Sequence, residues 1–167
     1  MKKQIILLAI AAISIAFFSC TKDEVEEAAA SVTTASMSAT VNDTTWTSIT
    51  RVTKKFHTPE SFVITGTSTD QRILVITIRG IEKGTYTTSV QLEDPSAQVG
   101  GAWRANSANY FSKAGTVEIT KLDTVNKKIS GTFNFDLISQ TDLDGFKVEL
   151  GKFDNLSYTE SDSSSEN

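Results

Sequence analysis

Residues that commonly carry catalysis are sparse in this chain. His57 is the only histidine, and Ser61 lies close after it in the sequence. A serine nucleophile needs a positioned histidine, an acid and an oxyanion hole, and no G-x-S-x-G nucleophile motif occurs. Because His57 stands beside Thr58-Pro59 in an expected turn, we predict that it is a surface residue rather than a general base.

The sequence gives equally little evidence for a metal site or for a catalytic pair of acids. The chain has one histidine and one cysteine, too few for a zinc site. Asp142-x-Asp144-Gly145 is similar to a fragment of a calcium loop, but Phe153 stands at the twelfth position, where a glutamate is needed. Glu93-Asp94 or another acidic pair could hydrolyse a glycoside, although any acidic chain offers such pairs. We expect no catalytic residues, no metal and no cofactor, with a carboxylate-dependent hydrolase as a minor alternative.

The single cysteine directly follows an apolar run at the N-terminus. Lys2 and Lys3 precede residues 5–18, which are almost entirely apolar. As a helix this run would span about 21 Å, which is short for a bilayer core of about 30 Å but suits an export signal. Residues 1–19 are therefore predicted to be a signal peptide. An internal disulfide is excluded for Cys20, because the chain has no second cysteine.

Ser19-Cys20, placed directly after the apolar run, resembles a bacterial lipoprotein signal. The resemblance implies that a diacylglycerol alkylates the sulfur of Cys20 and that cleavage leaves Cys20 as the first residue. An ordinary signal peptidase would prefer Ala28-Ala29-Ala30, but a charged spacer separates that site from the apolar run. We therefore expect a lipid anchor, in which two or three acyl chains hold far more firmly than one.

The residues after the cysteine are charged. Lys22, Asp23 and Glu24 resemble the surface-export tag of Bacteroidetes lipoproteins, a lysine followed by acids. The resemblance implies an outer-membrane protein that faces the cell exterior, with the lipoprotein processing and export machinery as partners. The alternative is a solvated charged linker. Residues 20–34 as a whole are small, polar or acidic, so we predict a lipidated cysteine followed by a flexible tether.

Composition limits the remaining partners. Without residues 1–19 the chain keeps 14 Lys and Arg against 20 Asp and Glu, a formal charge of −6. No basic cluster with interleaved aromatic residues occurs, so we expect no nucleic acid partner. Residues 35–158 are predicted to form a single β domain. Residues 159–167 are serine-rich and acidic, and we predict that they are disordered.

Alternation of apolar and polar residues with a period of two dominates residues 35–158. The clearest strand is 128–137, in which every second side chain is apolar. Asn42-Asp43 and Asp144-Gly145 indicate hairpin turns, and Gly151 indicates a bulge. No stretch shows a convincing helical period. We predict an all-β fold, an antiparallel β-sandwich or flattened β-barrel of about eight or nine strands.

Several strand and turn motifs of this region are similar to those of small uncharacterised Bacteroidetes lipoproteins, which share a β-rich domain of unknown function. The similar stretches are residues 39–46, 64–68, 84–86, 115–123, 129–136 and 151–156. This resemblance implies a location and a fold, but it transfers no active site.

Aromatic residues supply the remaining candidates. Trp46 and Tyr86 are expected in the core, whereas Trp103 and Tyr110 lie in residues 91–115, the least regular part of the sequence. Because loops often carry function, Trp103 and Tyr110 are predicted to contact a ligand. The sequence thus favours a surface-anchored, non-catalytic binding or accessory module for a polysaccharide or a protein. A barrel that holds a small apolar ligand is the alternative.

Overall fold

The computed structural model describes residues 34–89, 94, 96–106, 108–139 and 145–163. Within these ranges all regular elements are strands, which confirms the predicted all-β class. The strands belong to the compact unit Thr33–Asn167. They are β1 (Ser36–Val41), β2 (Thr44–Thr47), β3 (Thr50–Thr58), β4 (Glu60–Thr67), β5 (Ile73–Ile78), β6 (Gly84–Thr88), β7 (Val99–Ala105), β8 (Ala108–Asp123), β9 (Lys128–Ser139), β10 (Gly145–Ser157) and β11 (Thr159–Ser163). Across the described residues, a helix with the length and apolar character needed to cross a bilayer is absent.

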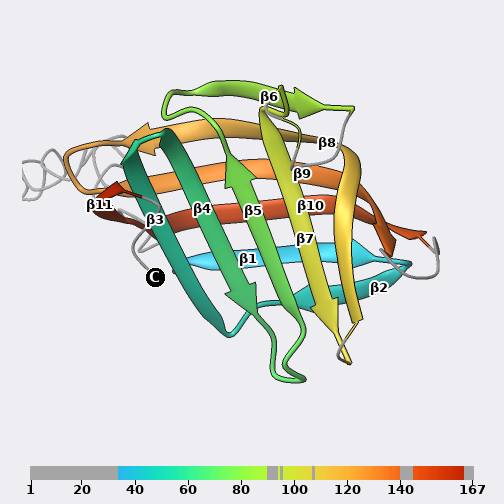
Figure 1. Cartoon of the computed structure of the whole chain (residues 1–167). Coiled ribbons are helices and arrows are strands. Elements are labelled where there is room, and N and C mark those ends of the chain that lie inside the picture. Colours follow the sequence, from blue (N-terminus) through green and yellow to red (C-terminus); the bar gives the residue numbers. More distant parts are fainter. Residues whose placement is uncertain (1–33, 90–93, 95, 107, 140–144, 164–167) are drawn as a thin grey trace, which may run out of the picture. The chain divides into compact units, whose positions relative to one another are not determined.

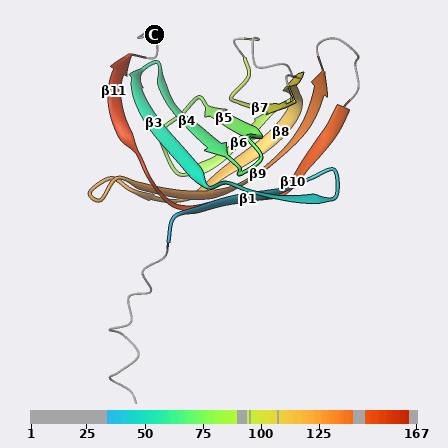
Figure 2. The same cartoon turned by 90° about the horizontal axis from the view of Figure 1, so that it is seen from below.

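The strands form one sheet in the order β11-β3-β4-β5-β7-β8-β9-β10-β1-β2, with β6 paired to β8 beside this path (Figure 1). The pairs are antiparallel, except that β11 runs parallel to β3. Most strands pair with a neighbour in sequence, as short turns favour. Figure 2 shows that this sheet curls into a half-barrel around one interior.

Two corners hold the ends of the curled sheet together. Between β2 and β3, the amide of Ser48 donates to the carbonyl of Met37 on β1, and the amide of Ile49 donates to Thr67 on β4. At the second corner, β10 continues through Tyr158 into β11, which pairs with β3. Each corner therefore connects strands that stand near opposite ends of the sheet order. Orthogonally packed sheets are joined in a similar way, by a bent strand that passes from one sheet to the other.

Inward-facing side chains fill the interior of the curl. On β9 the predicted alternation is confirmed, because Phe133, Phe135 and Leu137 are buried while the intervening Asn134 is exposed. Aromatic rings occupy the space above glycines: a Cβ atom on Gly101 of β7 would lie 2.7 Å from the Phe135 ring. The core also contains Trp46, which is fully buried as predicted, while Tyr86 is partly buried and packs against the core cluster.

The backbone confirms several predicted turns and bulges. Asn42 and Asp43 have positive φ angles of 45° and 62°, as a tight hairpin between β1 and β2 requires. The pairing of β10 with β9 shifts register between Val148 and Gly151, which is the predicted bulge. The predicted turn at Asp144-Gly145 begins outside the described residues.

The prediction of irregular structure for residues 91–115 is wrong over much of that range. Residues 99–105 form β7, and β8 begins at Ala108. The alternation of β7 is hidden because Gly100 and Gly101 stand where apolar side chains would have revealed it. The Phe135 ring from β9 fills the space that a larger residue at 101 would have taken.

The prediction of disorder for residues 159–167 is also wrong in part, because Thr159–Ser163 form β11. This strand is held by its backbone pairing with β3 and by Glu160, which contacts Lys55 at 3.3 Å and Lys127 at 2.9 Å. Residues 164–167 lie outside the described residues. The strands outnumber the eight or nine predicted because β7 and β11 were missed and residues 44–58 divide into β2 and β3.

Candidate functional site

The residues predicted for membrane anchoring are not among those that the structure describes. Cys20, Lys22, Asp23 and Glu24 all precede residue 34, where the description begins. The same holds for the predicted signal peptide, residues 1–19. Lipidation and surface export therefore stay predictions from the sequence.

Trp103 and Tyr110 are brought together by the structure, but in paired strands instead of a loop. They oppose each other across β7 and β8. Trp103 points into the core with only 3% of its surface exposed, and its ring meets that of Trp46 edge-on at 5.8 Å. Tyr110 is half-buried, and its ring lies 4.2 Å from that of Phe146. These rings pack mainly against one another, so their predicted contact with a ligand stays a prediction.

A charged group lies beside this aromatic cluster. The guanidinium of Arg72 is 5.7 Å from the centre of the Trp103 ring, and its Nε lies 2.6 Å from the Asp70 carboxylate. Ser68 also donates its hydroxyl hydrogen to Asp70. The hydrogen bond from Arg72, followed by that from Ser68, lowers the pKa of Asp70 to about 2. Asp70 is therefore ionised at neutral pH and positions Arg72 for a cation–π contact.

The catalytic candidates do not converge. His57 is exposed at the end of β3, as predicted, and the nearby Ser61 donates its hydroxyl hydrogen to the Pro59 carbonyl at 3.0 Å. Asp94 accepts hydrogen bonds from the amide and hydroxyl of Ser96, which lower its pKa. Within the described ranges, no three His, Cys, Asp or Glu side chains group closely enough to hold a metal ion. Glu93 and Asp142 lie outside those ranges.

The outward face of the half-barrel carries an apolar row that crosses four strands. The pairing registers place its members side by side, because Val75 opposes Ala102, Ala102 opposes Phe111, and Phe111 opposes Ile138. All four are partly exposed, whereas Leu74 and Ile76 on either side of Val75 are buried in the core. We call Val75, Ala102, Phe111 and Ile138 the outer row.

A hollow of about 230 Å³ lies along the outer row, at β5, β7 and β8. Ile73, Arg104 and Asn109 form the next register row on the same face and also line the hollow. Trp103 and Tyr110 contribute to its lining as well. A second hollow, of about 490 Å³, shares Ile73 and Arg104 and is lined otherwise by polar residues of the β4–β5 and β7–β8 turns. The outer face therefore combines an apolar strip with a polar margin.

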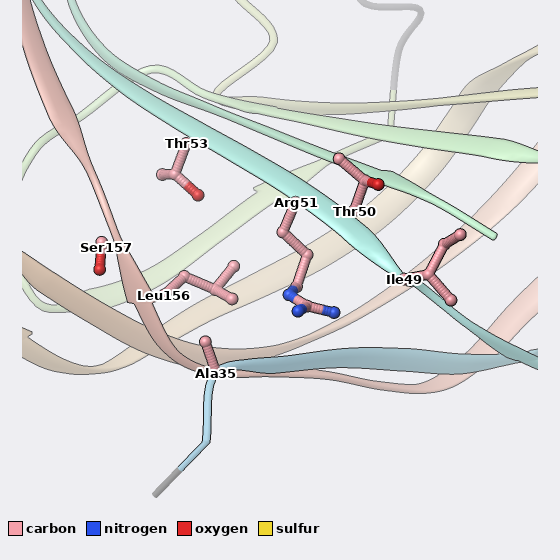
Figure 3. A pocket seen from close by; sticks show the side chains of 7 residues that line it. All are labelled: Ala35, Ile49, Thr50, Arg51, Thr53, Leu156 and Ser157. Atoms are coloured by element: carbon pink, nitrogen blue, oxygen red, sulfur yellow. The ribbon is translucent and has the colours of Figure 1, made fainter.

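A third hollow, of about 370 Å³, lies where the ends of the sheet approach each other (Figure 3). Its lining residues are Ala35, Ile49, Thr50, Arg51, Thr53, Leu156 and Ser157. The pairing of β3 with β11 begins only at Lys54, so within the described strands residues 50–53 pair on one side only, with β4. We call this hollow the seam pocket.

The polar side chains of the seam pocket are incompletely satisfied. Arg51 donates from Nη1 to the Ser48 carbonyl at 2.7 Å, and the described residues form no ion pair with it. The hydroxyl of Thr53 is buried, yet it has no hydrogen-bond partner in the described part of the chain. Buried polar groups are normally paired, so an orphan hydroxyl at a pocket is a feature to explain.

Sequence reasoning did not identify the outer row or the seam pocket. A partial signal for the outer row existed, because Ile73 and Val75 alternate with the equally apolar Leu74 and Ile76, which puts apolar residues on both faces of a strand. For the seam pocket no such signal exists, since Ala35, Arg51 and Leu156 are far apart in sequence and meet only through the curl of the sheet.

Comparisons with curated proteins and with solved structures found no match. A family model, described as a domain of unknown function (DUF6252), matches residues 33–157. The matched range begins just before β1 and ends with β10, so it spans the whole curled sheet except β11. This chain therefore belongs to the DUF6252 family of domains of unknown function.

Proposed function

We propose that this chain is an outer-membrane lipoprotein, anchored through Cys20 and facing the cell exterior, whose β domain is a non-catalytic module that binds another protein. The anchor rests on the apolar run, the solitary cysteine and the acidic residues that follow it. Residues 20–34 would then separate the domain from the lipid surface.

The observation that carries the binding role is the outer row. Outward faces of half-buried sheets are usually polar, so four partly exposed apolar residues in register across four strands need a reason. Arg104 and Asn109 stand at its margin. An apolar centre that includes an aromatic residue, with arginine beside it, is the composition of protein–protein interfaces.

A protein partner fits this surface better than a polysaccharide does. Recognition of a sugar by stacking would need an open aromatic face, but Trp103 is buried in the core and Tyr110 packs on Phe146. Phe111 is the aromatic residue of the outer row. The two alternatives have weaker support: rings such as Phe135 occupy the interior where a small apolar ligand would sit, and no three acids group closely among the described residues.

Mass spectrometry of the membrane fraction tests the anchor. We expect an acylated chain that begins at Cys20, and the Cys20→Ser variant should lose both acylation and membrane association. External protease on intact cells should cleave the wild type, while alanine at Lys22, Asp23 and Glu24 should keep acylation and lose surface exposure. An unacylated mature protein that begins at Ser31 would contradict the proposal.

Site-specific photo-crosslinking in cells tests the outer row. A benzophenone amino acid at Phe111 should give one discrete protein adduct, and adding Val75→Glu, which places a charge in the same row two strands away, should abolish that adduct. The same probe at Val125, which is 87% exposed in the β8–β9 turn, serves as the matched control. Equal adducts from both positions, or an adduct that survives Val75→Glu, would remove the outer row as the binding surface.

A further inference from the structure

We propose that the seam pocket binds a small carboxylate that carries a short apolar chain. This site is separate from the outer row, and its occupant is a small molecule instead of a protein, so the inference does not depend on the proposed function. Four independent features of the pocket support it: an orphan hydroxyl, an arginine without an acid, a surplus of nearby cations and an apolar floor.

The orphan hydroxyl belongs to Thr53. This residue is only 4% exposed, and its Oγ1 has no hydrogen-bond partner within the described part of the chain. In Figure 3 the hydroxyl points from β3 into the space above Leu156. A buried hydroxyl without a partner is unfavourable relative to a paired one. A ligand oxygen at this position would supply the missing acceptor.

Arg51 lies two positions before Thr53 on the same strand, so both side chains leave the same face of β3. Figure 3 shows the Arg51 side chain extending away from β3, with its guanidinium between Leu156 and Ile49. Its Nη1 hydrogen bonds to Ser48 fix the planar group in place, and none of the described carboxylates pairs with it. A fixed guanidinium with unused donors is well suited to a carboxylate, because the two planar groups match.

Nearby cations add a positive field. Ser157, which lines the pocket, accepts a hydrogen bond from the Lys128 ammonium at 2.6 Å. Lys55 and Lys127 both pair with Glu160, so this single carboxylate offsets only one of their two positive charges. In a chain with a net charge of −4, this concentration of cations favours an anionic ligand locally.

Besides these polar groups and Thr50, three apolar residues line the pocket. Leu156 is 1% exposed and forms part of the core, while Ile49 is 59% exposed at the β2–β3 corner. Ala35 closes the side next to β1. A volume of about 370 Å³ lies at the low end of the range for small-molecule pockets. A bare anion would leave Leu156, Ile49 and Ala35 uncovered, which is why we assign a carboxylate with an apolar chain.

Titration calorimetry on the full-length chain in lipid nanodiscs tests the proposal, with empty nanodiscs as the blank. The probes are hexanoate, 1-hexanol as its neutral counterpart, and inorganic phosphate. We expect saturable binding of hexanoate, with hexanol and phosphate at least tenfold weaker. Arg51→Gln should weaken hexanoate binding about tenfold or more, because it removes a charge-assisted pair. Lys83→Gln, the same change of charge at an exposed residue before β6, should leave binding unchanged.

Thr53→Val separates a binding role from a structural one. The substitution keeps the shape of the side chain and removes the hydroxyl, so hexanoate affinity should fall about fivefold while the unliganded protein melts no lower. Equal binding of hexanoate and hexanol, binding of phosphate alone, or unchanged hexanoate affinity in Arg51→Gln would each overturn the proposal. The anchoring and crosslinking outcomes above are read separately, so each proposal can fail without the other.

Discussion

Two regions of the sheet differ in how completely their polar groups are hydrogen-bonded. One is the wall formed by β7, β8 and β9, and the other is the seam beside β3. In the wall, strands pair on both sides and rings such as Phe135 press onto glycine backbones. At the seam, residues 50–53 pair on one side only within the described strands, and Thr53 keeps an unpaired buried hydroxyl. The curled sheet thus satisfies its polar groups where it is continuous, and it leaves a buried hydroxyl unpaired where its ends meet.

Gly131→Ala in the wall should have the largest effect. A Cβ atom at this position would overlap the Glu118 carbonyl oxygen and lie 2.5 Å from Cζ of Phe153. The backbone oxygen cannot move without disturbing the pairing of β8 with β9, so we expect the free energy of unfolding to fall by about 3 kcal/mol or more. Urea denaturation measures this, with Thr132→Ala on the exposed face of β9 as the control. A loss below about 1 kcal/mol would show that the wall adapts more easily than the contacts imply.

Thr53→Val at the seam should stabilise the protein, by less than Gly131→Ala destabilises it. Gly131 and Thr53 are both buried, but Thr53→Val removes a hydroxyl that has no hydrogen-bond partner among the described residues. We expect the free energy of unfolding to rise by about 1 kcal/mol in the absence of ligand. Thermal and urea unfolding of the two variants side by side give the measurement. A destabilisation of similar size would mean that the hydroxyl is paired in solution.

Glu160, which holds β11 to β3, should give the smallest effect, and one that depends on pH. Hydrogen bonds from Lys127 and then Lys55 lower the pKa of Glu160 below its usual value of 4.5. Its contribution is therefore complete above that value and is lost as the pH falls through the lowered pKa. The protection factors of β11 amides, which correct for the slower intrinsic exchange at low pH, should fall on acidification, and Glu160→Gln should show the lower protection already at neutral pH. Identical exchange profiles for both proteins would rule out a role for this carboxylate in holding β11.

Prediction from sequence succeeded where local pattern and burial coincide. The alternation of β9, the Asn42-Asp43 turn and the Gly151 bulge are each encoded within a few residues. It failed for β7, because Gly100 and Gly101 remove the side chains that would show a period. It failed for β11 because a polar edge strand held by backbone pairing and by Glu160 resembles a disordered tail in composition.

The candidate sites were less accessible to prediction for a geometric reason. Trp103 and Tyr110 oppose each other in paired strands, and the sequence does not show that Trp103 faces inward while Phe111 faces outward. The seam pocket depends on residues from the start of β1, from β3 and from the end of β10. No local pattern links these segments, because only the closure of the sheet brings them together.

Closure by β11 also bears on the order in which the molecule can be assembled. A shift in register between Phe153 and Leu156, with Asn155 at a φ of 52°, bends the end of β10 toward its new partner. The segment beyond that bend is the last of the described strands to leave the ribosome, yet it pairs with β3, which was made more than half a domain earlier. Until it arrives, one margin of β3 stays open, so a nascent chain must be kept from pairing that margin with another molecule.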